Sequence, residues 1–219
     1  FAVGHLGAAR QRHAFEPRVF GGELGRTDAA VDGEQPDPVA WLAQHGGGIR
    51  GLVTSAPVGA DAALLAALPP TLHTPTRIQQ LAIPVVLAGQ DLLALAQTGS
   101  GKTLAFGLPL LQGLDAASDR VQGLVLVPTR ELATQVNAAL QGVAEALGLR
   151  TLTLCGGVPQ EQQQAELALG PQLLVATPGR LRDLLAQRRL GLSNLRTLVL
   201  DEADRLLEMG FWPDIQWLL

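Results

Sequence analysis

Short apolar runs alternate with helix-like segments from residue 61 onward, and this alternation restricts the chain to few folds. The runs end in Gly, Pro or Asp, and they read DLLALAQ (91–97), GLVLVP (123–128), RTLTLCGG (150–157), QLLVATP (172–178) and RTLVLDEAD (196–204). Strands that are apolar throughout are typical of a parallel sheet covered by helices on both faces. The sequence therefore predicts an α/β fold of three layers with a mostly parallel central sheet.

The segment RELATQVNAALQGVAEAL (130–147) shows the helical period most clearly. Its apolar residues recur at steps of three and four along the chain: Leu132, Val136, Leu140, Val143 and Leu147. This spacing places them on one face of a helix, which we expect to pack against the sheet. In sheets of this kind ligands bind beyond the carboxyl ends of the strands, which is where the polar motifs of this chain fall.

Composition narrows the class of protein further. The 219 residues, 47% of them hydrophobic, are enough for a substantial domain with a packed core. No apolar stretch is long enough to span a membrane, and none near the start has the order of a signal peptide. A single cysteine, Cys155, fits a reducing compartment, so we expect a cytoplasmic location. The net charge of −4 argues against binding nucleic acid by bulk charge, while a local arginine patch is compatible with it.

Residues 1–60 differ from the rest and are predicted to form a loop-rich extension of unknown role. They are rich in Gly, Pro, Asp and Arg, and their apolar runs are brief. His5, His13 and His45 have neither the spacing of metal ligands nor evident acidic partners, so we expect them to be solvated. The chain starts with Phe1 rather than Met, which suggests a piece of a longer protein.

The segment AQTGSGKT (96–103) joins an apolar run to a helix-like segment and contains the sole lysine of the chain. Gly99 and Gly101 would let backbone N–H groups turn inward around phosphate oxygens at a helix N-terminus. Lys102 would reach the β- and γ-phosphates, where its compact ammonium fits better than a broad guanidinium, and the Thr103 hydroxyl would bind Mg²⁺. The segment has Ala96 where the general phosphate-loop pattern has Gly.

Two adjacent carboxylates follow the apolar run TLVL (197–200). Asp201 would hold Mg²⁺ through its hydration shell, and Glu202 would orient and deprotonate an attacking water. Two carboxylates at the end of a buried strand are costly without a cation nearby, so a purely structural role is disfavoured. With Lys102, they predict the catalytic site of a nucleoside triphosphatase.

The tetrapeptide Asp201-Glu202-Ala203-Asp204, taken with the phosphate loop, makes residues 64–219 resemble the first RecA-like domain of DEAD-box ATP-dependent RNA helicases. The family's own phosphate loop starts with Ala, and Asp204 favours the DEAD branch over DEAH-type relatives. The resemblance implies a RecA-like P-loop NTPase fold, ATP and Mg²⁺ as cofactors, and RNA as partner.

The resemblance also implies that the domain, predicted at 61–219, is truncated. The family's Ser-Ala-Thr segment is absent from residues 205–219, as is the second RecA-like domain that would act in cis. We therefore expect an exposed strand edge, and a chain that binds nucleotide without unwinding RNA.

The resemblance implies a set of nucleotide-binding residues: Leu72, Arg77, Gln79, Gln97, Thr98, Gly99, Ser100, Gly101, Lys102 and Thr103. The Gln79 amide would donate to and accept from the adenine edge at once, which distinguishes ATP from GTP. Leu72 stands where the family carries an aromatic that stacks on adenine. We expect weaker adenine binding for that reason, with more of the discrimination left to Gln79.

Further motifs imply RNA contacts through PTRELA, a Gly-Gly pair and TPGR, with these residues: Pro128, Thr129, Arg130, Gly157, Thr177, Pro178, Gly179 and Arg180. Strand ends that lead into helix N-termini would grip backbone phosphates and not bases. The implied partner is single-stranded or locally duplex RNA, bound with little sequence preference. Farther along, Met209 and Phe211 are expected to pack in the core.

Two other functions stay open. One is a different P-loop nucleic-acid ATPase, such as a DNA helicase, and the other is a non-catalytic binding module. The sequence does not indicate the RNA substrate, the pathway or the oligomeric state.

Overall fold

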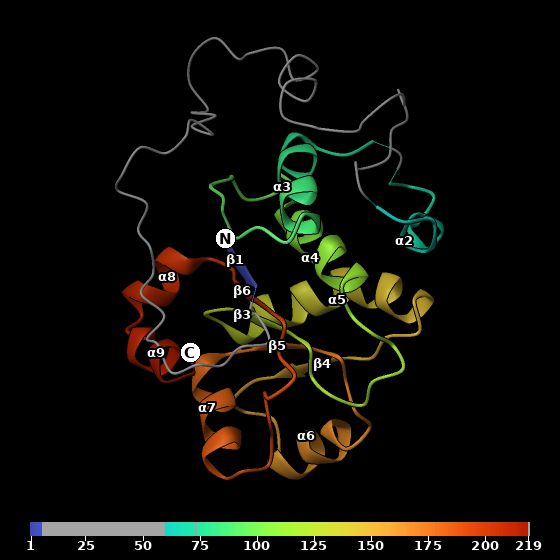
Figure 1. Ribbon diagram of the computed structural model, residues 1–219. Helices are drawn as coiled ribbons and strands as arrows, with labels where there is room; N and C mark the ends of the chain where they lie inside the picture. The colour runs from blue at the N-terminus through green and yellow to red at the C-terminus, as the bar shows by residue number, and fades with distance from the viewer. Residues whose placement is uncertain (6–59, 73, 219) are drawn as a thin grey trace. The chain divides into compact units, whose positions relative to one another are not determined.

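A six-stranded sheet lies at the centre of the computed structural model, which describes residues 1–5, 60–72 and 74–218 (Figure 1). The order across the sheet is β2-β1-β6-β3-β5-β4. The strands are β1 (Ala2–His5), β2 (Leu92–Leu93), β3 (Gly123–Leu126), β4 (Thr151–Leu154), β5 (Leu173–Ala176) and β6 (Thr197–Leu200). The helices are α2 (Ala62–Ala67), α3 (Arg77–Leu87), α4 (Lys102–Gln112), α5 (Arg130–Ala146), α6 (Gln160–Leu167), α7 (Pro178–Ala186), α8 (Ala203–Glu208) and α9 (Trp212–Leu218).

Helices cover both faces of the parallel strands β6, β3, β5 and β4, which confirms the predicted α/β fold. Successive residues of β3 point to opposite faces, as strand geometry requires. Val125 belongs to a core cluster with residues of α3, α4 and α5, whereas Leu124 and Leu126 belong to a second cluster with residues of α7, α8 and α9. The apolar runs of the sequence follow from this double burial.

The helix predicted from the period of its apolar residues is α5. Val136, Leu140 and Val143 are at most 3% exposed, and Leu132 and Leu147 pack at the edge of the same core cluster. The helix begins where the Thr129 hydroxyl accepts a hydrogen bond from the Leu132 N–H at 3.2 Å, which satisfies one free donor of the first turn.

The strand β1 was not expected from the sequence, which assigns residues 1–60 to an extension. It runs antiparallel to both β2 and β6 and lies between them. All four residues of β6 are therefore paired with β1, while β2 and β4 are the outer strands of the sheet. Phe1–His5 belong to the same compact unit as residues 60–72 and 74–218, and residues 6–59, with His13 and His45, lie outside the described residues.

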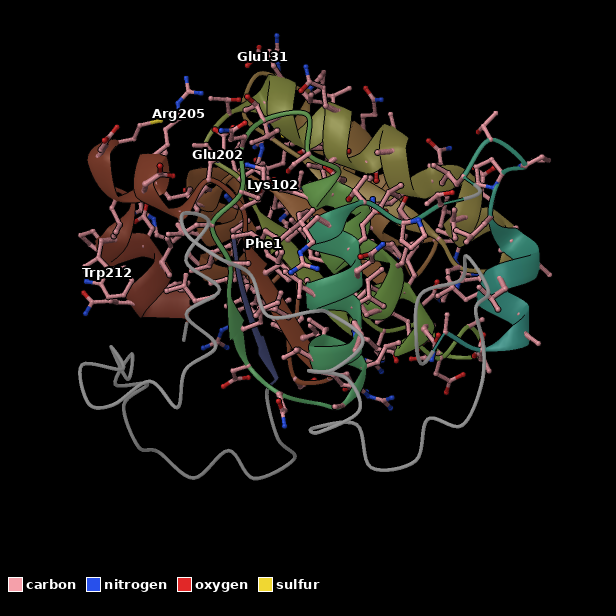
Figure 2. The ribbon with its side chains drawn as sticks, turned by 90° about the horizontal axis from the view of Figure 1, so that it is seen from above. Phe1, Lys102, Glu131, Glu202, Arg205 and Trp212 are labelled. Atoms are coloured by element: carbon pink, nitrogen blue, oxygen red, sulfur yellow. The ribbon has the colours of Figure 1, made fainter. Side chains whose placement is uncertain are left out.

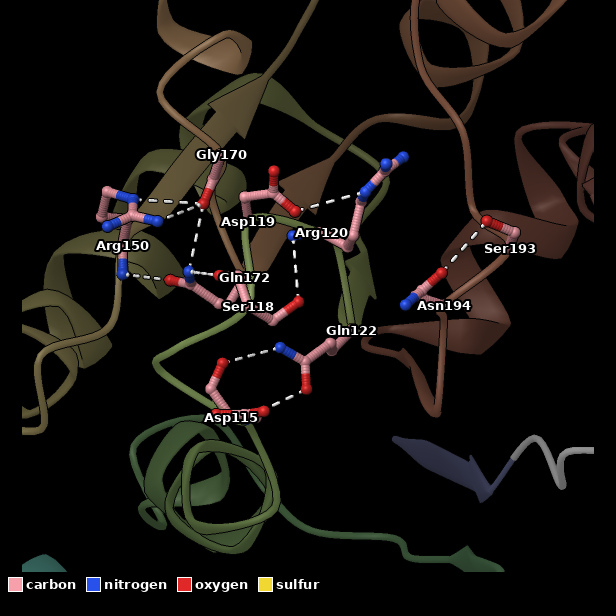
Figure 3. A network of polar contacts seen from close by, with 10 residues as sticks. All are labelled: Asp115, Ser118, Asp119, Arg120, Gln122, Arg150, Gly170, Gln172, Ser193 and Asn194. Carbon is pink, nitrogen blue, oxygen red and sulfur yellow. Dashed lines mark hydrogen bonds and ion pairs between the residues drawn. The ribbon is translucent and has the colours of Figure 1, made fainter.

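Buried amides just before β3 and β5 bond to residues of the neighbouring connecting segments (Figure 3). Gln122 Nε2 donates to the Asp115 carbonyl at 2.9 Å, and Gln122 Oε1 accepts from the Asp115 N–H at 3.0 Å. Gln172 accepts from the Arg150 N–H at 2.8 Å and donates to the carbonyls of Gly170 and Ser118. Both glutamines are at most 1% exposed, so these bonds satisfy amides that water cannot reach.

The end of the chain gives a mixed result for the predicted core. Phe211 packs against the second core cluster, as expected, but Met209 is 49% exposed, so its predicted core position is wrong. Met209 follows the last residue of α8, where that short helix ends and the chain turns at Gly210. Within the described part of the chain, no helix combines the length and the apolar character that crossing a membrane requires.

Candidate nucleotide site

The predicted phosphate loop connects β2 to α4 at the carboxyl end of the sheet. Gly99 and Gly101 have φ values of 80° and 92°, a left-handed conformation that side chains disfavour. The N–H and hydroxyl of Ser100 both donate to the Gln97 carbonyl, at 3.3 and 2.7 Å, which folds the loop back on itself. The helix α4 then begins at Lys102, so its free N–H groups and the lysine lie together, as anion binding requires.

The rest of the predicted loop is accessible to a ligand. Gln97, Thr98 and Gly99 are exposed, and Ser100, Gly101, Lys102 and Thr103 are half-buried. The remainder of α4, from Ala105 to Leu111, is buried in the core. A rigid buried helix therefore presents its first turn, with Lys102 and Thr103, at the surface.

Gln79 lies against the phosphate loop. Its Nε2 donates to the Gly101 carbonyl at 3.1 Å, and its Oε1 accepts from the Thr76 N–H at 2.9 Å at the start of α3. The side chain is buried, and a Cβ added to Gly101 would lie 2.6 Å from Gln79 Nε2. These bonds leave one N–H and part of the oxygen for adenine, so the predicted recognition of the base stays a prediction.

The contact between Gln79 and the loop is a feature that sequence reasoning missed. The bond between Gln79 and the Thr76 N–H could have been predicted from the sequence. A Thr followed three residues later by a Gln, as Thr76 is by Gln79, is the pattern of a capping box. The bond from Gln79 to the Gly101 carbonyl joins residues 22 apart, and no short sequence pattern predicts it. The other predicted adenine residues, Leu72 and Arg77, are exposed near the start of α3.

Asp201 is held in place at the end of β6. It is 3% exposed, its N–H donates to the Leu126 carbonyl at 2.9 Å, and its Oδ1 accepts from the Glu202 N–H at 3.0 Å. Burial raises the pKa of Asp201, while the charge of Lys102 and the Glu202 N–H act to lower it. Because β1 is antiparallel to both β2 and β6, the segments that follow β2 and β6 leave the sheet at the same end, and these segments contain Lys102 and Asp201.

Glu202 has a left-handed backbone with φ of 49°, which is rare for a residue with a side chain. Its Oε2 lies 3.4 Å from Nη1 of Arg205 one turn along α8. Such strain persists where the surroundings enforce it and is common at active sites. Figure 2 shows Glu202 and Lys102 toward the same side of the molecule, with Phe1 near them in that view. Burial lowers the pKa of the Phe1 amino group, and Asp201 and Lys102 act on it with opposite signs.

The donor set suits Mg²⁺ bound together with phosphates. Within the described residues no group of three or more His, Cys, Asp or Glu side chains could hold a metal alone. Mg²⁺ usually takes one or two protein ligands and completes its shell with water and substrate phosphates. The Asp201 carboxylate and the Thr103 hydroxyl, each beside a strand end or helix start, fit that pattern.

The predicted RNA residues gather at the neighbouring strand ends. Thr129 caps α5, and Thr177 precedes α7, whose first residue is Pro178. Arg130 has a side chain that is 56% exposed, and its Nη1 would lie 3.1 Å from a Cβ added to Gly157. The structure thus brings Arg130 and Gly157 together, while Pro128 is buried and Gly179 is half-buried beside Arg180.

Arg180 has protein partners of its own. Its Nε donates to the Cys155 carbonyl at 3.2 Å and its Nη2 to the Val158 carbonyl at 2.5 Å. Gln163 of α6 donates to the same Cys155 carbonyl at 3.0 Å. These bonds fix the loop that contains Gly157. The structure therefore shows Arg180 as a residue that holds this loop, a role that the sequence did not indicate.

Comparison with known proteins identifies the family. The sequence model of the DEAD/DEAH box helicases matches residues 76–219. The chain is 52% identical over 139 residues to the ATP-dependent RNA helicase DbpA of Escherichia coli, an alignment that covers 63% of this chain and 30% of DbpA. It is 49% identical over 146 residues to the ATP-dependent RNA helicase DeaD of Buchnera aphidicola, covering 66% of this chain and 24% of DeaD.

A solved structure gives the same result. The crystal structure of a DEAD box protein from Methanococcus jannaschii is 34% identical, with a TM-score of 0.66 over 72% of this chain and 44% of that one. The chain spans about a third or less of the length of the curated relatives it matches. The family match covers most of the chain and includes the phosphate loop and the Asp201-Glu202 pair. The chain belongs to the DEAD/DEAH box helicase family.

Proposed function

We propose that this chain is the ATP-binding domain of an RNA-dependent ATPase that locally unwinds or remodels RNA duplexes. The observation that carries the proposal is the phosphate loop, in which Gly99 and Gly101 are left-handed and α4 begins at Lys102. The loop lies at the same end of the sheet as the buried Asp201, because β2 and β6 are both antiparallel to β1 and therefore run in the same direction. The names of the relatives, ATP-dependent RNA helicases, support ATP as the nucleotide and RNA as the partner.

The residues of the site have separate roles in the proposed reaction. Lys102 and the first N–H groups of α4 would bind the phosphate oxygens of ATP. Mg²⁺, held by Asp201 and Thr103, would neutralise phosphate charge when bound. Glu202 would accept the proton of the water that attacks the γ-phosphate, and its fixed backbone would keep the carboxylate aimed.

Arg130, Thr129, Thr177 and the loop of Gly157 would contact RNA phosphates. Efficient hydrolysis and unwinding are proposed to need a second RecA-like domain in cis, so that this chain alone binds nucleotide without unwinding. We also propose a cytoplasmic location, which the single Cys155 supports.

Titration of the chain with a fluorescent ADP analogue tests nucleotide binding. We expect saturable binding that Lys102→Ala weakens by about tenfold or more, in line with the loss of a charged hydrogen bond. Arg120→Ala is the matched control, because Arg120 is an exposed cation near the opposite end of β3. Equal loss in both variants would contradict a phosphate site at Lys102.

ATP hydrolysis by a longer form of the protein, with and without single-stranded RNA or DNA, tests the reaction. Stimulation by RNA that Glu202→Gln abolishes is expected. Stronger stimulation by DNA would favour another nucleic-acid ATPase, and no hydrolysis would favour a non-catalytic binding module.

A further inference from the structure

The strand β1 connects the two halves of the nucleotide site. One neighbour, β2, leads into the phosphate loop, and the other, β6, ends next to Asp201. Ala2 of β1 is paired with Leu93 on one side and with Leu200 on the other. The residue after Leu200 is Asp201, so β1 pairs with β6 up to the metal carboxylate.

The contacts of Phe1 reinforce this position. The Phe1 nitrogen donates to the Ala94 carbonyl at 2.8 Å, and the Ala94 N–H donates to the Phe1 carbonyl at 2.9 Å. The Phe1 ring is 7% exposed, and its centroid lies 5.3 Å from that of Phe106, one turn into α4 from Lys102. Phe1 thus contacts both Ala94, which directly follows β2, and the helix after the phosphate loop.

From these contacts we infer that β1 is a positioning strand, which sets the separation between the phosphate loop and Asp201. Neighbouring strands lie about 4.8 Å apart, so a strand between β2 and β6 keeps them roughly two such spacings apart. If β1 left the sheet, β2 would either pair directly with β6 or lose its partner. Both outcomes would move Lys102 relative to Asp201. The inference rests on the proposed function, because it assigns that separation a role in binding nucleotide with Mg²⁺.

A change in β1 can be made without removing the rest of the core. The second core cluster, which includes Leu124, Leu174 and Leu181, contains no residue of β1. The pairing of β1 with β2 involves only two residue pairs, and Gly4 within the strand has no side chain to pack. Val3 is 2% exposed and belongs to the first cluster, so a charge at this position would expel the strand.

Val3→Asp is the test variant, and Val3→Thr is a milder one that keeps the shape and adds a hydroxyl. Hydrogen exchange without nucleotide is the first readout. We expect both variants to raise exchange at residues 93–101 and 201–202, with β3 and β5 unchanged. Ala63→Asp, an exposed position in α2, is the control for the added charge. Unchanged exchange at the two site segments, with β1 itself exchanging faster, would overturn the inference.

Affinity for fluorescent ADP, measured with Mg²⁺ and with a chelator, is the second readout. Loss of the contacts that orient a metal ligand typically lowers metal affinity by about 10–100-fold. The tightening of ADP binding by Mg²⁺ should therefore fall by at least about tenfold, while the ADP affinity in chelator stays within about twofold. Tightening that stays unchanged in both variants would overturn the inference. If the unaltered chain binds no ADP, the proposed function fails, and the exchange comparison still decides the role of β1.

Discussion

Gln79 and Gly101 form a direct link between the start of α3 and the phosphate loop, with Gln79 Nε2 donating to the Gly101 carbonyl at 3.1 Å. Because Gln79 Oε1 also accepts from the Thr76 N–H, a single amide fixes both segments. A ligand that engaged this amide would act on the loop through it. Base recognition and phosphate binding would then be coupled through one side chain.

Gln79→Ala should therefore weaken the binding of ADP by about tenfold. It should also lower the free energy of unfolding by about 1–3 kcal/mol, because it breaks two hydrogen bonds of a buried amide. The neighbouring Gln80→Ala is the control, because Gln80 is exposed and its side-chain amide donates to the Pro75 carbonyl and not to the phosphate loop. A fluorescence titration and a denaturant melt measure the two effects. If ADP affinity fell equally in both variants, the link to the loop would have no special role.

Gly101→Ala and Gly142→Ala should change stability in opposite directions. At Gly101 the backbone is left-handed and a Cβ would meet Gln79 Nε2 at 2.6 Å, so we expect a loss of about 1–3 kcal/mol. Gly142 lies exposed within α5 with nothing within 4 Å of an added Cβ, so alanine there should add about 0.5–1 kcal/mol. Denaturant melts of both variants provide the comparison. A stable Gly101→Ala would show that the loop adapts.

Glu202→Gly should be more stable than Glu202→Gln by about 1 kcal/mol, because glycine relieves the left-handed backbone at φ of 49°. Both variants lose the charge that faces Arg205, so that charge does not contribute to the difference between them. Thermal unfolding measures it. Equal stability would mean that the conformation at Glu202 costs little.

Arg180→Lys should weaken binding of single-stranded RNA about as much as Arg180→Gln, because neither side chain can bridge the Cys155 and Val158 carbonyls in the same way. If Arg180 acts through the loop, the dependence of affinity on salt should stay the same. Arg130→Gln should instead reduce the salt slope by about one phosphate contact. If Arg180→Lys kept the affinity for single-stranded RNA, a direct contact of Arg180 with phosphate would be indicated instead.

Leu72→Phe should tighten the binding of ADP. Leu72 is 40% exposed near α3, and an aromatic ring at this position would cover the adenine face. The stacking of a base on an aromatic ring is worth about 1–3 kcal/mol, so the gain should be several-fold or more. Leu65→Phe, at a similarly exposed leucine in α2, is the control. Equal affinity of Leu72→Phe and the unaltered chain would remove the stacking hypothesis.

The sequence predicted the parallel half of the sheet well, because strands buried on both faces need apolar residues at every position. It also predicted that residues 96–103 join a strand to a helix and that Asp201-Glu202 follow a strand, as the structure has them, while their roles in binding nucleotide stay predictions. It did not predict β1, because no turn or residue pattern in Phe1–His5 indicates which strands it pairs with, and these strands lie some 90 to 200 residues away. The role of Arg180 was hidden for a similar reason: its acceptors are backbone carbonyls, which every residue has.

The buried amides of Gln122 and Gln172 also affect how the sheet assembles. A strand that slipped by two residues would keep every apolar side chain on its proper face, so burial alone would tolerate that error. Both amides would then lose partners that lie at fixed places in the neighbouring turns. Each unpaired buried amide costs about 1–3 kcal/mol, enough to disfavour the slipped alignment. During folding, the two glutamines would thus favour the correct register of the strands, at the end of the sheet opposite to the predicted nucleotide site.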